Sequence, residues 1–342
     1  MKKLFCILLS ICLFCAVLGC KEKDKDNFKV SSTAENNSST TSKTAEKESE
    51  PQKSDNSSEN VSSDDIKEQV SSAAPETDTT KQSDEPKSPP NPTEIPESGV
   101  PFISAEYTDE QLMNLDNKKN GYGHGVHKDA DNRPTGATGA QERYGKYGAV
   151  FIAPKSQYVF LTFDLGYENG YTPKILDTLA EKNAKGIFFV TMEYCKSAPD
   201  IVKRIIDEGH VLGNHSVHHK SMPTLSIDEM RSEIMGMHDY IKEKYGYEMF
   251  LFRPPMGEYS ERSLAVAQSL GYQTMNWSFA YKDWDTANQP DTAYAKNKMI
   301  NDAHGGAVYL IHAVSKTNAA VLGSVIDGIR SKGYVTAKYV KS

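Results

Sequence analysis

The chain has 342 residues, of which 25% are Asp, Glu, Lys or Arg, and a formal net charge of −7 at pH 7. A net negative charge excludes the basic footprint with which proteins bind nucleic acid, so we expect no nucleic-acid partner. The part after residue 98 is long enough to form one large domain with a substantial core.

The N-terminus has the pattern of an export signal. Lys2 and Lys3 precede an apolar run over residues 4–18, and small residues follow. The ending Val-Leu-Gly-Cys20 resembles a bacterial lipobox, in which the cysteine becomes the lipidated first residue. We therefore expect residues 1–19 to be a signal peptide and Cys20 to hold the protein at the membrane, outside the cytoplasm. An ordinary signal peptide and an uncleaved anchor are the alternatives, although the run is short for a membrane span of about 20 residues.

Residues 20–98 are composed mainly of Ser, Thr, Asn, Lys, Asp, Glu and Pro, with Phe28 as their only aromatic residue. Such a segment buries too little apolar surface to offset the entropy of ordering, so we expect a disordered linker. Residues 99–150 are rich in Gly, Asn and Asp and predict an N-terminal extension of loops, with one short helix over residues 109–115. Cys195 is the only cysteine beyond Cys20, which excludes an internal disulfide in the domain.

From residue 158 onward, short apolar runs alternate with helix-like segments. Repeated strand–helix units predict an α/β fold with a parallel sheet, and a distorted (β/α) barrel is favoured over an open sheet. In such a barrel the chemistry lies at the C-terminal ends of the strands. The expected strands are residues 158–163, 186–190, 211–212, 249–252, 273–277, 307–311 and 334–337, and the expected helices are 173–182, 198–208, 226–245, 261–270, 293–302 and 319–332.

Polar residues recur where these strands end. His215 and His219 are four residues apart, a spacing that lets two imidazoles bind one metal ion, although a hydrogen-bonded pair is the alternative. Asp164 is a candidate general base or a helix cap. Arg253 could keep that carboxylate ionised or form a structural ion pair. His312 is a candidate acid for a leaving group or a satisfied core histidine.

Aromatic side chains accompany these groups. Tyr167, Trp277 and Trp284 could offer apolar faces to sugar rings or could belong to the core. For His124 and His127 in the loop GHGVH, a structural role is favoured over metal binding.

Five motifs together resemble the polysaccharide deacetylase family, the NodB-like enzymes of carbohydrate esterase family 4. They are TFDLG, HSVHH, RPPMG, KDW and LIH, and their order and spacing agree with that family from residue 158 to the C-terminus. The resemblance implies a NodB-like domain over residues 151–342 and metal-assisted removal of acetyl groups from N-acetylated sugars. Asp164 would take a proton from water, and His312 would protonate the departing amine. Asp283 would orient Arg253 or His312, and the oxyanion would be held by the metal and the backbone N–H after Gly257.

The longer string TFDLGYENGYTPKIL resembles the delta-lactam-biosynthetic de-N-acetylases, which act on muramic acid in peptidoglycan during spore cortex formation. That likeness implies glycan strands as the partner and N-acetylmuramic acid without a stem peptide as the substrate. We expect the protein to be a monomer. The alternatives are deacetylation of N-acetylglucosamine in peptidoglycan or of another polysaccharide, and an inactive, wall-binding lipoprotein. The residues expected to contact substrate are Tyr167, Asn169, Pro255, Gly257, Trp277 and Trp284.

Two positions depart from the family pattern. Leu165 stands where the family has a metal-binding aspartate, and Ala280 stands where a further aspartate often precedes the Asp-Trp pair. The expected cofactor is therefore a divalent ion such as zinc, held by His215 and His219 with water and substrate.

Overall fold

The computed structural model describes residues 92–342. The predicted signal peptide, Cys20 and most of the predicted linker lie outside the described residues. Within the described part of the chain, no helix is both long and apolar enough to cross a membrane. Residues 97 and 98 form strand β1 (Glu97–Ser98), which pairs with β12 (Lys338–Tyr339), so regular structure begins before the predicted linker boundary at residue 98.

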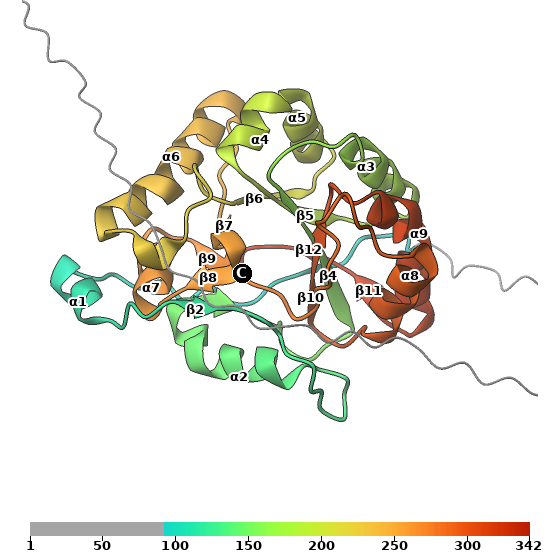
Figure 1. Ribbon diagram of the computed structural model, residues 1–342, viewed down its shortest axis with the longest axis horizontal. Coiled ribbons are helices and arrows are strands. Elements are labelled where there is room, and N and C mark those ends of the chain that lie inside the picture. Colours follow the sequence, from blue (N-terminus) through green and yellow to red (C-terminus); the bar gives the residue numbers. More distant parts are fainter. Residues whose placement is uncertain (1–91) are drawn as a thin grey trace, which may run out of the picture. The chain divides into compact units, whose positions relative to one another are not determined.

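A curled parallel sheet forms the centre of the fold, with helices around it (Figure 1). Its strands follow the order β10-β4-β5-β6-β7-β9-β3, and β11 pairs with β4. A parallel bridge between Phe279, after β9, and Tyr309 of β10 brings the two sides of the sheet together. The predicted distorted (β/α) barrel is thus confirmed. The strands are β3 (Ala149–Val150), β4 (Tyr158–Leu165), β5 (Gly186–Val190), β6 (Val211–Asn214), β7 (Leu251–Phe252), β9 (Gln273–Met275), β10 (Ala307–His312) and β11 (Val335–Thr336).

All six predicted helices are present, with ends within three residues of the expected ones. They are α3 (Thr172–Glu181), α5 (Pro199–Asp207), α6 (Ile227–Tyr245), α7 (Glu261–Ser269), α8 (Thr292–Asn301) and α9 (Lys316–Ser331). The Ser226 hydroxyl accepts the N–H of Glu229 while the Glu229 carboxylate accepts the N–H of Ser226, and this reciprocal pair is a capping box at the start of α6. A short helix that was not predicted, α4 (Met192–Ser197), follows β5.

The N-terminal extension is more regular than its composition predicts. Helix α1 (Asp109–Asn114) was expected, whereas α2 (Thr135–Tyr144) and strand β3 were assigned to loops. A Cβ atom on Gly136 would lie 2.6 Å from the carbonyl oxygen of His124, so close packing requires glycine in α2, at the expense of helix propensity. The extension also pairs β2 (Asn120–Gly121) with β8 (Glu258–Tyr259), next to the expected substrate residue Gly257.

Two apolar clusters lie on opposite faces of the sheet. Leu161, Phe163 and Leu165 of β4 pack against apolar side chains of the surrounding helices in the larger cluster. Phe160 of the same strand packs in the smaller cluster inside the barrel. Since successive side chains of a strand alternate between faces, Asp164 lies on the inner face with Phe160. The strand therefore carries its acid to the open end of the barrel.

Candidate active site

A pocket of about 590 Å³ lies at the C-terminal ends of the strands. It brings together residues from β4, the loops after β6, β7 and β9, and β10, as the barrel geometry predicts. Its lining residues are Asp164, His215, His219, Met256, Gly257, Trp277, Ala280, Tyr281, Trp284, Leu310 and His312.

Arg253 lies beneath this pocket with no exposed surface. Its Nη1 donates a 2.6 Å hydrogen bond to Asp164 Oδ1, and its other nitrogens donate to the carbonyl oxygens of Met275 (2.9 Å) and Asn276 (3.1 Å). Burial alone would raise the pKa of Asp164, but the Arg253 charge, with help from His215 and His312, holds it below its usual value. The carboxylate is therefore kept ionised at neutral pH.

His215 and His219 meet at the edge of the same pocket. His215 Nδ1 lies 2.8 Å from the carbonyl oxygen of Arg253, and donation to that oxygen leaves the lone pair on Nε2. The two Nε2 atoms are 3.2 Å apart, and Asp164 Oδ2 lies 3.7 Å from that of His215. Burial lowers the pKa of His215 to about 4, so its imidazole is neutral and fit to bind a metal.

The histidine geometry fits one shared ion. Two nitrogens bound tetrahedrally to zinc at about 2.0–2.1 Å are separated by about 3.3 Å, close to the observed distance. Among residues 92–342, however, no group of three or more His, Cys, Asp and Glu side chains has the geometry of a metal site. Leu165 does not supply a third ligand, because its hydrocarbon side chain has no donor atom, and that side chain packs in the cluster under the helices. The chain thus offers two imidazole nitrogens, with further positions left to water or substrate.

A buried carboxylate holds the turn that carries both histidines. Glu233 of α6 accepts hydrogen bonds from the backbone N–H of His218 and from His218 Nδ1, both at 2.7 Å. Its backbone oxygen accepts the N–H of Val217. His218 therefore has a structural contact, and Glu233 is a supporting residue that the sequence did not reveal.

We expect Glu233→Gln to weaken zinc binding by about 10- to 100-fold, because residues that support metal ligands have effects of this size. The amide keeps the shape of Glu233 but cannot accept two strong bonds from His218. Zinc affinity measured by competition with a chromophoric chelator checks this, with exposed Glu243→Gln on the same helix as control. Equal affinities for the two variants would contradict the supporting role.

His312 and Asp283 form a second ionisable pair. His312 Nδ1 lies 2.7 Å from Asp283 Oδ1, and its backbone N–H donates to Oδ2 at 2.8 Å. Asp283 is buried and also accepts from Asn318 Nδ2 at 2.6 Å. Burial would lower the pKa of His312, but the hydrogen bond and the charge of Asp283 raise it above its usual value. Of the two alternatives for Asp283, the structure thus has the contact with His312.

The expected substrate residues divide into two groups. Trp277, Gly257 and Trp284 line the pocket, and a Cβ atom on Gly257, where φ is 64°, would lie 2.6 Å from the Trp277 ring. Tyr167, Asn169 and Pro255 are not among the lining residues, and the Asn169 amide donates to the carbonyl oxygen of Val314. Met256, Ala280, Tyr281 and Leu310 are lining residues that the sequence did not single out as substrate contacts.

One expected contact is already occupied. The backbone N–H of Glu258, which follows Gly257, donates to the carbonyl oxygen of Pro255. The expectation that this N–H holds an oxyanion is therefore not met in this conformation. The cause is the tight turn of Pro255–Gly257, in which Met256 has a φ of 59°.

Comparison with known proteins agrees with this geometry. A sequence profile of polysaccharide deacetylases matches residues 152–275. The chain is 43% identical over 191 residues to the peptidoglycan-N-acetylmuramic acid deacetylase PdaA of Bacillus subtilis, covering 55% of this chain and 73% of that protein. It is 34% identical over 193 residues to a peptidoglycan-N-acetylglucosamine deacetylase of Bacillus cereus, covering 55% and 69%. The solved structure of Bacillus subtilis PdaA, a family 4 carbohydrate esterase, superposes with a TM-score of 0.62 at 37% identity, covering 66% of this chain and 96% of that one.

A curled parallel sheet with ionisable side chains at its open end is the fold of family 4 carbohydrate esterases, which are hydrolases. The chain belongs to the polysaccharide deacetylase family, whose members hydrolyse the amide bonds of N-acetylated sugars.

Proposed function

We propose that the protein removes the N-acetyl group from N-acetylmuramic acid residues of peptidoglycan that lack a stem peptide. The observation that carries this proposal is the placement of two charge pairs at one pocket, Asp164 with Arg253 at 2.6 Å and His312 with Asp283 at 2.7 Å. Arg253 holds the pKa of Asp164 below its usual value, and the hydrogen bond and charge of Asp283 hold the pKa of His312 above its usual value. An enzyme that uses a base and an acid at the same pH needs one group that is deprotonated and another that is protonated. Environments that move the two pKa values apart meet this need. The muramic preference rests on the similarity to PdaA.

In this mechanism Asp164 accepts the proton of the attacking water, and Arg253 keeps Asp164 ready by favouring its charged form. A divalent metal would be held by Nε2 of His215 and of His219, and when bound it supplies polarisation of the acetyl carbonyl and a more acidic water. His312 donates its proton to the departing amine. The apolar faces of Trp277 and Trp284 orient the sugar ring.

The products of this step are acetate and a free amine on muramic acid. In the proposed pathway the amine condenses with the lactyl carboxyl of the same sugar, losing one water, and forms the delta-lactam of spore cortex. We also propose that lipidated Cys20 anchors the monomeric protein to the membrane, with its domain acting on the wall outside the cytoplasm. The proposed location agrees with the proposed substrate, because peptidoglycan lies outside the cytoplasmic membrane.

Acetate release from purified peptidoglycan tests the proposed substrate. The protein, supplied with zinc, is incubated with intact peptidoglycan and with material from which an amidase has removed the stem peptides. We expect acetate from the stripped material alone. Equal release from both materials would favour N-acetylglucosamine as the target, and release from neither would favour an inactive, wall-binding role.

The Asp283 contact predicts a change in pH dependence. Because Asp283 raises the pKa of His312, the group is protonated to higher pH than an ordinary histidine, whose pKa is 6.5. In Asp283→Asn the raising charge is absent, so the alkaline limb of the pH–rate profile should move to lower pH. The half-buried neighbour Asp285, which pairs with Lys282 and does not contact His312, serves as control in Asp285→Asn. An unmoved alkaline limb would mean that another group sets it.

A further inference from the structure

A second pocket, of about 490 Å³, adjoins the active-site pocket at Ala280, which lines both. Its walls come from two parts of the chain that are far apart in sequence, the loop before α2 in the N-terminal extension and the C-terminal end of α8. The lining residues are Gly123, His124, Gly125, Val126, Lys128, Ala280, Lys298 and Asp302. A group attached to a sugar in the active site can therefore extend past Ala280 into this pocket.

The charged side chains of this pocket carry one positive charge in excess. Asp302 Oδ1 lies 2.6 Å from Lys128 Nζ, and Asp302 Oδ2 lies 2.9 Å from Lys298 Nζ. One carboxylate thus holds two ammonium groups together, and each ammonium keeps further N–H donors, since a lysine has three. Among the described residues that line the pocket, Asp302 is the only acidic one. Burial, with help from the charge of Lys298, lowers the pKa of His124, so its neutral imidazole leaves this balance unchanged.

The two lysines are held in place by the fold. Lys128 and Lys298 expose only 31% and 32% of their side chains. Asn132 ties the extension to the end of α8, because its amide donates to the carbonyl oxygens of Asn301 (3.0 Å) and Ala303 (2.9 Å). Groups that are already held together lose little further freedom when they bind a ligand. The pocket is therefore prepared to bind an anionic group.

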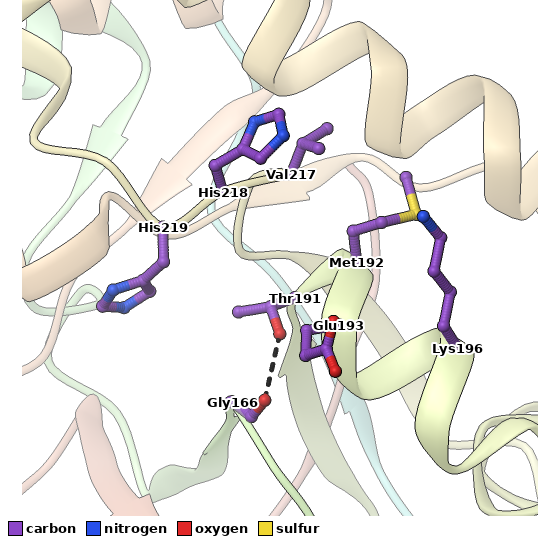
Figure 2. Close-up of a pocket in the computed structure, with 8 residues that line it drawn as sticks. All are labelled: Gly166, Thr191, Met192, Glu193, Lys196, Val217, His218 and His219. Atoms are coloured by element: carbon purple, nitrogen blue, oxygen red, sulfur yellow. Dashed lines mark hydrogen bonds between the residues drawn. The ribbon is translucent and has the colours of Figure 1, made fainter. Parts of the chain in front are cut away.

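A different pocket, of about 410 Å³, adjoins the active site at His219 and lacks this excess of charge. Figure 2 shows Glu193 and Lys196 on α4, across this pocket from Val217. One acidic and one basic side chain balance each other there. An anionic group on a bound sugar is therefore attracted to the pocket at Ala280 in preference to the pocket at His219.

We propose that the pocket at Ala280 binds the free lactyl carboxylate of the muramic acid residue that is deacetylated. In muramic acid the lactyl ether is on the carbon next to the one that carries the acetamido group. A sugar whose acetyl group lies at Asp164 thus brings its lactyl group to a neighbouring pocket. Ala280 has a short, uncharged side chain and leaves the passage between the two pockets free of a repelling charge.

This inference rests on the proposed function and gives it a physical cause. Where a stem peptide is attached, the lactyl carboxyl is an uncharged amide, and removal of the stem turns it into a carboxylate. Ammonium groups form strong, charge-assisted hydrogen bonds with a carboxylate and not with an amide. N-acetylglucosamine has a hydroxyl in place of the lactyl ether and gains nothing from the lysines. Lys128 and Lys298 would therefore select both the muramic sugar and its stem-free form.

Two ligands that differ only in charge test this inference. The stem-free tetrasaccharide and the methyl ester of its lactyl groups are titrated calorimetrically into full-chain Asp164→Asn protein with zinc, in which turnover is suppressed. We expect the acid to bind about 10- to 100-fold more tightly than the ester, the range for a hydrogen bond between charged groups. When Lys298→Met or Ala280→Asp is added, this ratio should fall to near one, because the excess charge is removed or cancelled. The matched control is Lys155→Met, which removes a lysine from the surface pair with Asp131 and should keep the ratio.

The ratio compares two ligands on one protein, so a variant with a smaller folded fraction still reports it. A preference for the acid that is lost in Lys298→Met and in Ala280→Asp supports the site even if the natural protein releases no acetate. Equal binding of the two ligands, or no binding of either, overturns the inference. A preference that both substitutions leave unchanged also overturns it. Acetate release from muramic acid without any preference would leave the proposed function standing and remove this site.

Discussion

Asp164→Asn should lower kcat for acetate release by about 10²- to 10⁴-fold, the range that a general base contributes. Asparagine matches aspartate in shape but cannot accept the proton of water. Asp164 Oδ1 accepts a 2.6 Å hydrogen bond from Arg253, which favours the charged carboxylate. Its other oxygen, Oδ2, lies 3.7 Å from His215 Nε2. Steady-state acetate release from stem-free glycan, with zinc supplied, measures the effect.

A control must separate lost chemistry from lost folding. The exposed Asp131→Asn changes the same chemical group in a surface pair with Lys155 and should keep full activity. Thermal unfolding of each variant confirms that the domain is folded. Activity of Asp164→Asn within tenfold of the natural protein would contradict the role of base.

The same residue links stability to acid. The pKa of Asp164 in the folded protein lies below its ordinary value of 3.8, so its ionised form stabilises the fold at pH values above that number. This contribution is lost as pH falls through the folded pKa. The stability difference between natural protein and Asp164→Asn should therefore be largest near neutral pH and should shrink in acid.

Arg253→Met should destabilise the domain by about 3–5 kcal/mol, the usual effect of removing one partner of a buried ion pair. Arg253 is wholly buried, and its substitution leaves the Asp164 carboxylate without its closest opposite charge. The pKa of Asp164 should rise, which moves the acid limb of the pH–rate profile to higher pH. Urea unfolding at pH 7 measures the first effect, and the pH dependence of kcat/KM measures the second.

A double variant distinguishes the ion pair from simple loss of packing. If the unpaired carboxylate causes the instability, Arg253→Met/Asp164→Asn should be more stable than Arg253→Met alone, since the buried charge is gone. A double variant as unstable as the sum of the two single variants would show that the pair is not the source. In that case the hydrogen bonds of Arg253 to Met275 and Asn276 would carry the effect.

The sequence predicted the strands whose ends carry the site and left much of the surrounding structure undetected. Strand β5 has the predicted bounds because five consecutive buried residues form a clear apolar run. Strands β1, β2 and β3 have two residues each, which is too short for a period-two pattern to be recognised. The extension was therefore predicted to consist mainly of loops, although it contributes strand β3 to the sheet.

Contacts between residues far apart in the chain could not be predicted from the sequence either. Asp283 is about 30 residues from both Arg253 and His312, so chain distance did not favour either partner, and the turn after β9 decides for His312. Tyr167 and Asn169 belong to a motif that predicted the pocket, yet the amide of Asn169 faces Val314. Helix α4 was not predicted, because it has only six residues between two stronger elements.

The position of the free amine in the product tests the central claim most directly. Stem-free peptidoglycan is treated with the protein and zinc, digested to disaccharides, and sequenced by fragment mass spectrometry. The account predicts loss of one acetyl group from muramic acid, with or without the further loss of water that marks the lactam. Loss of acetyl from glucosamine, or unmodified sugars in the presence of folded, zinc-supplied protein, would contradict it.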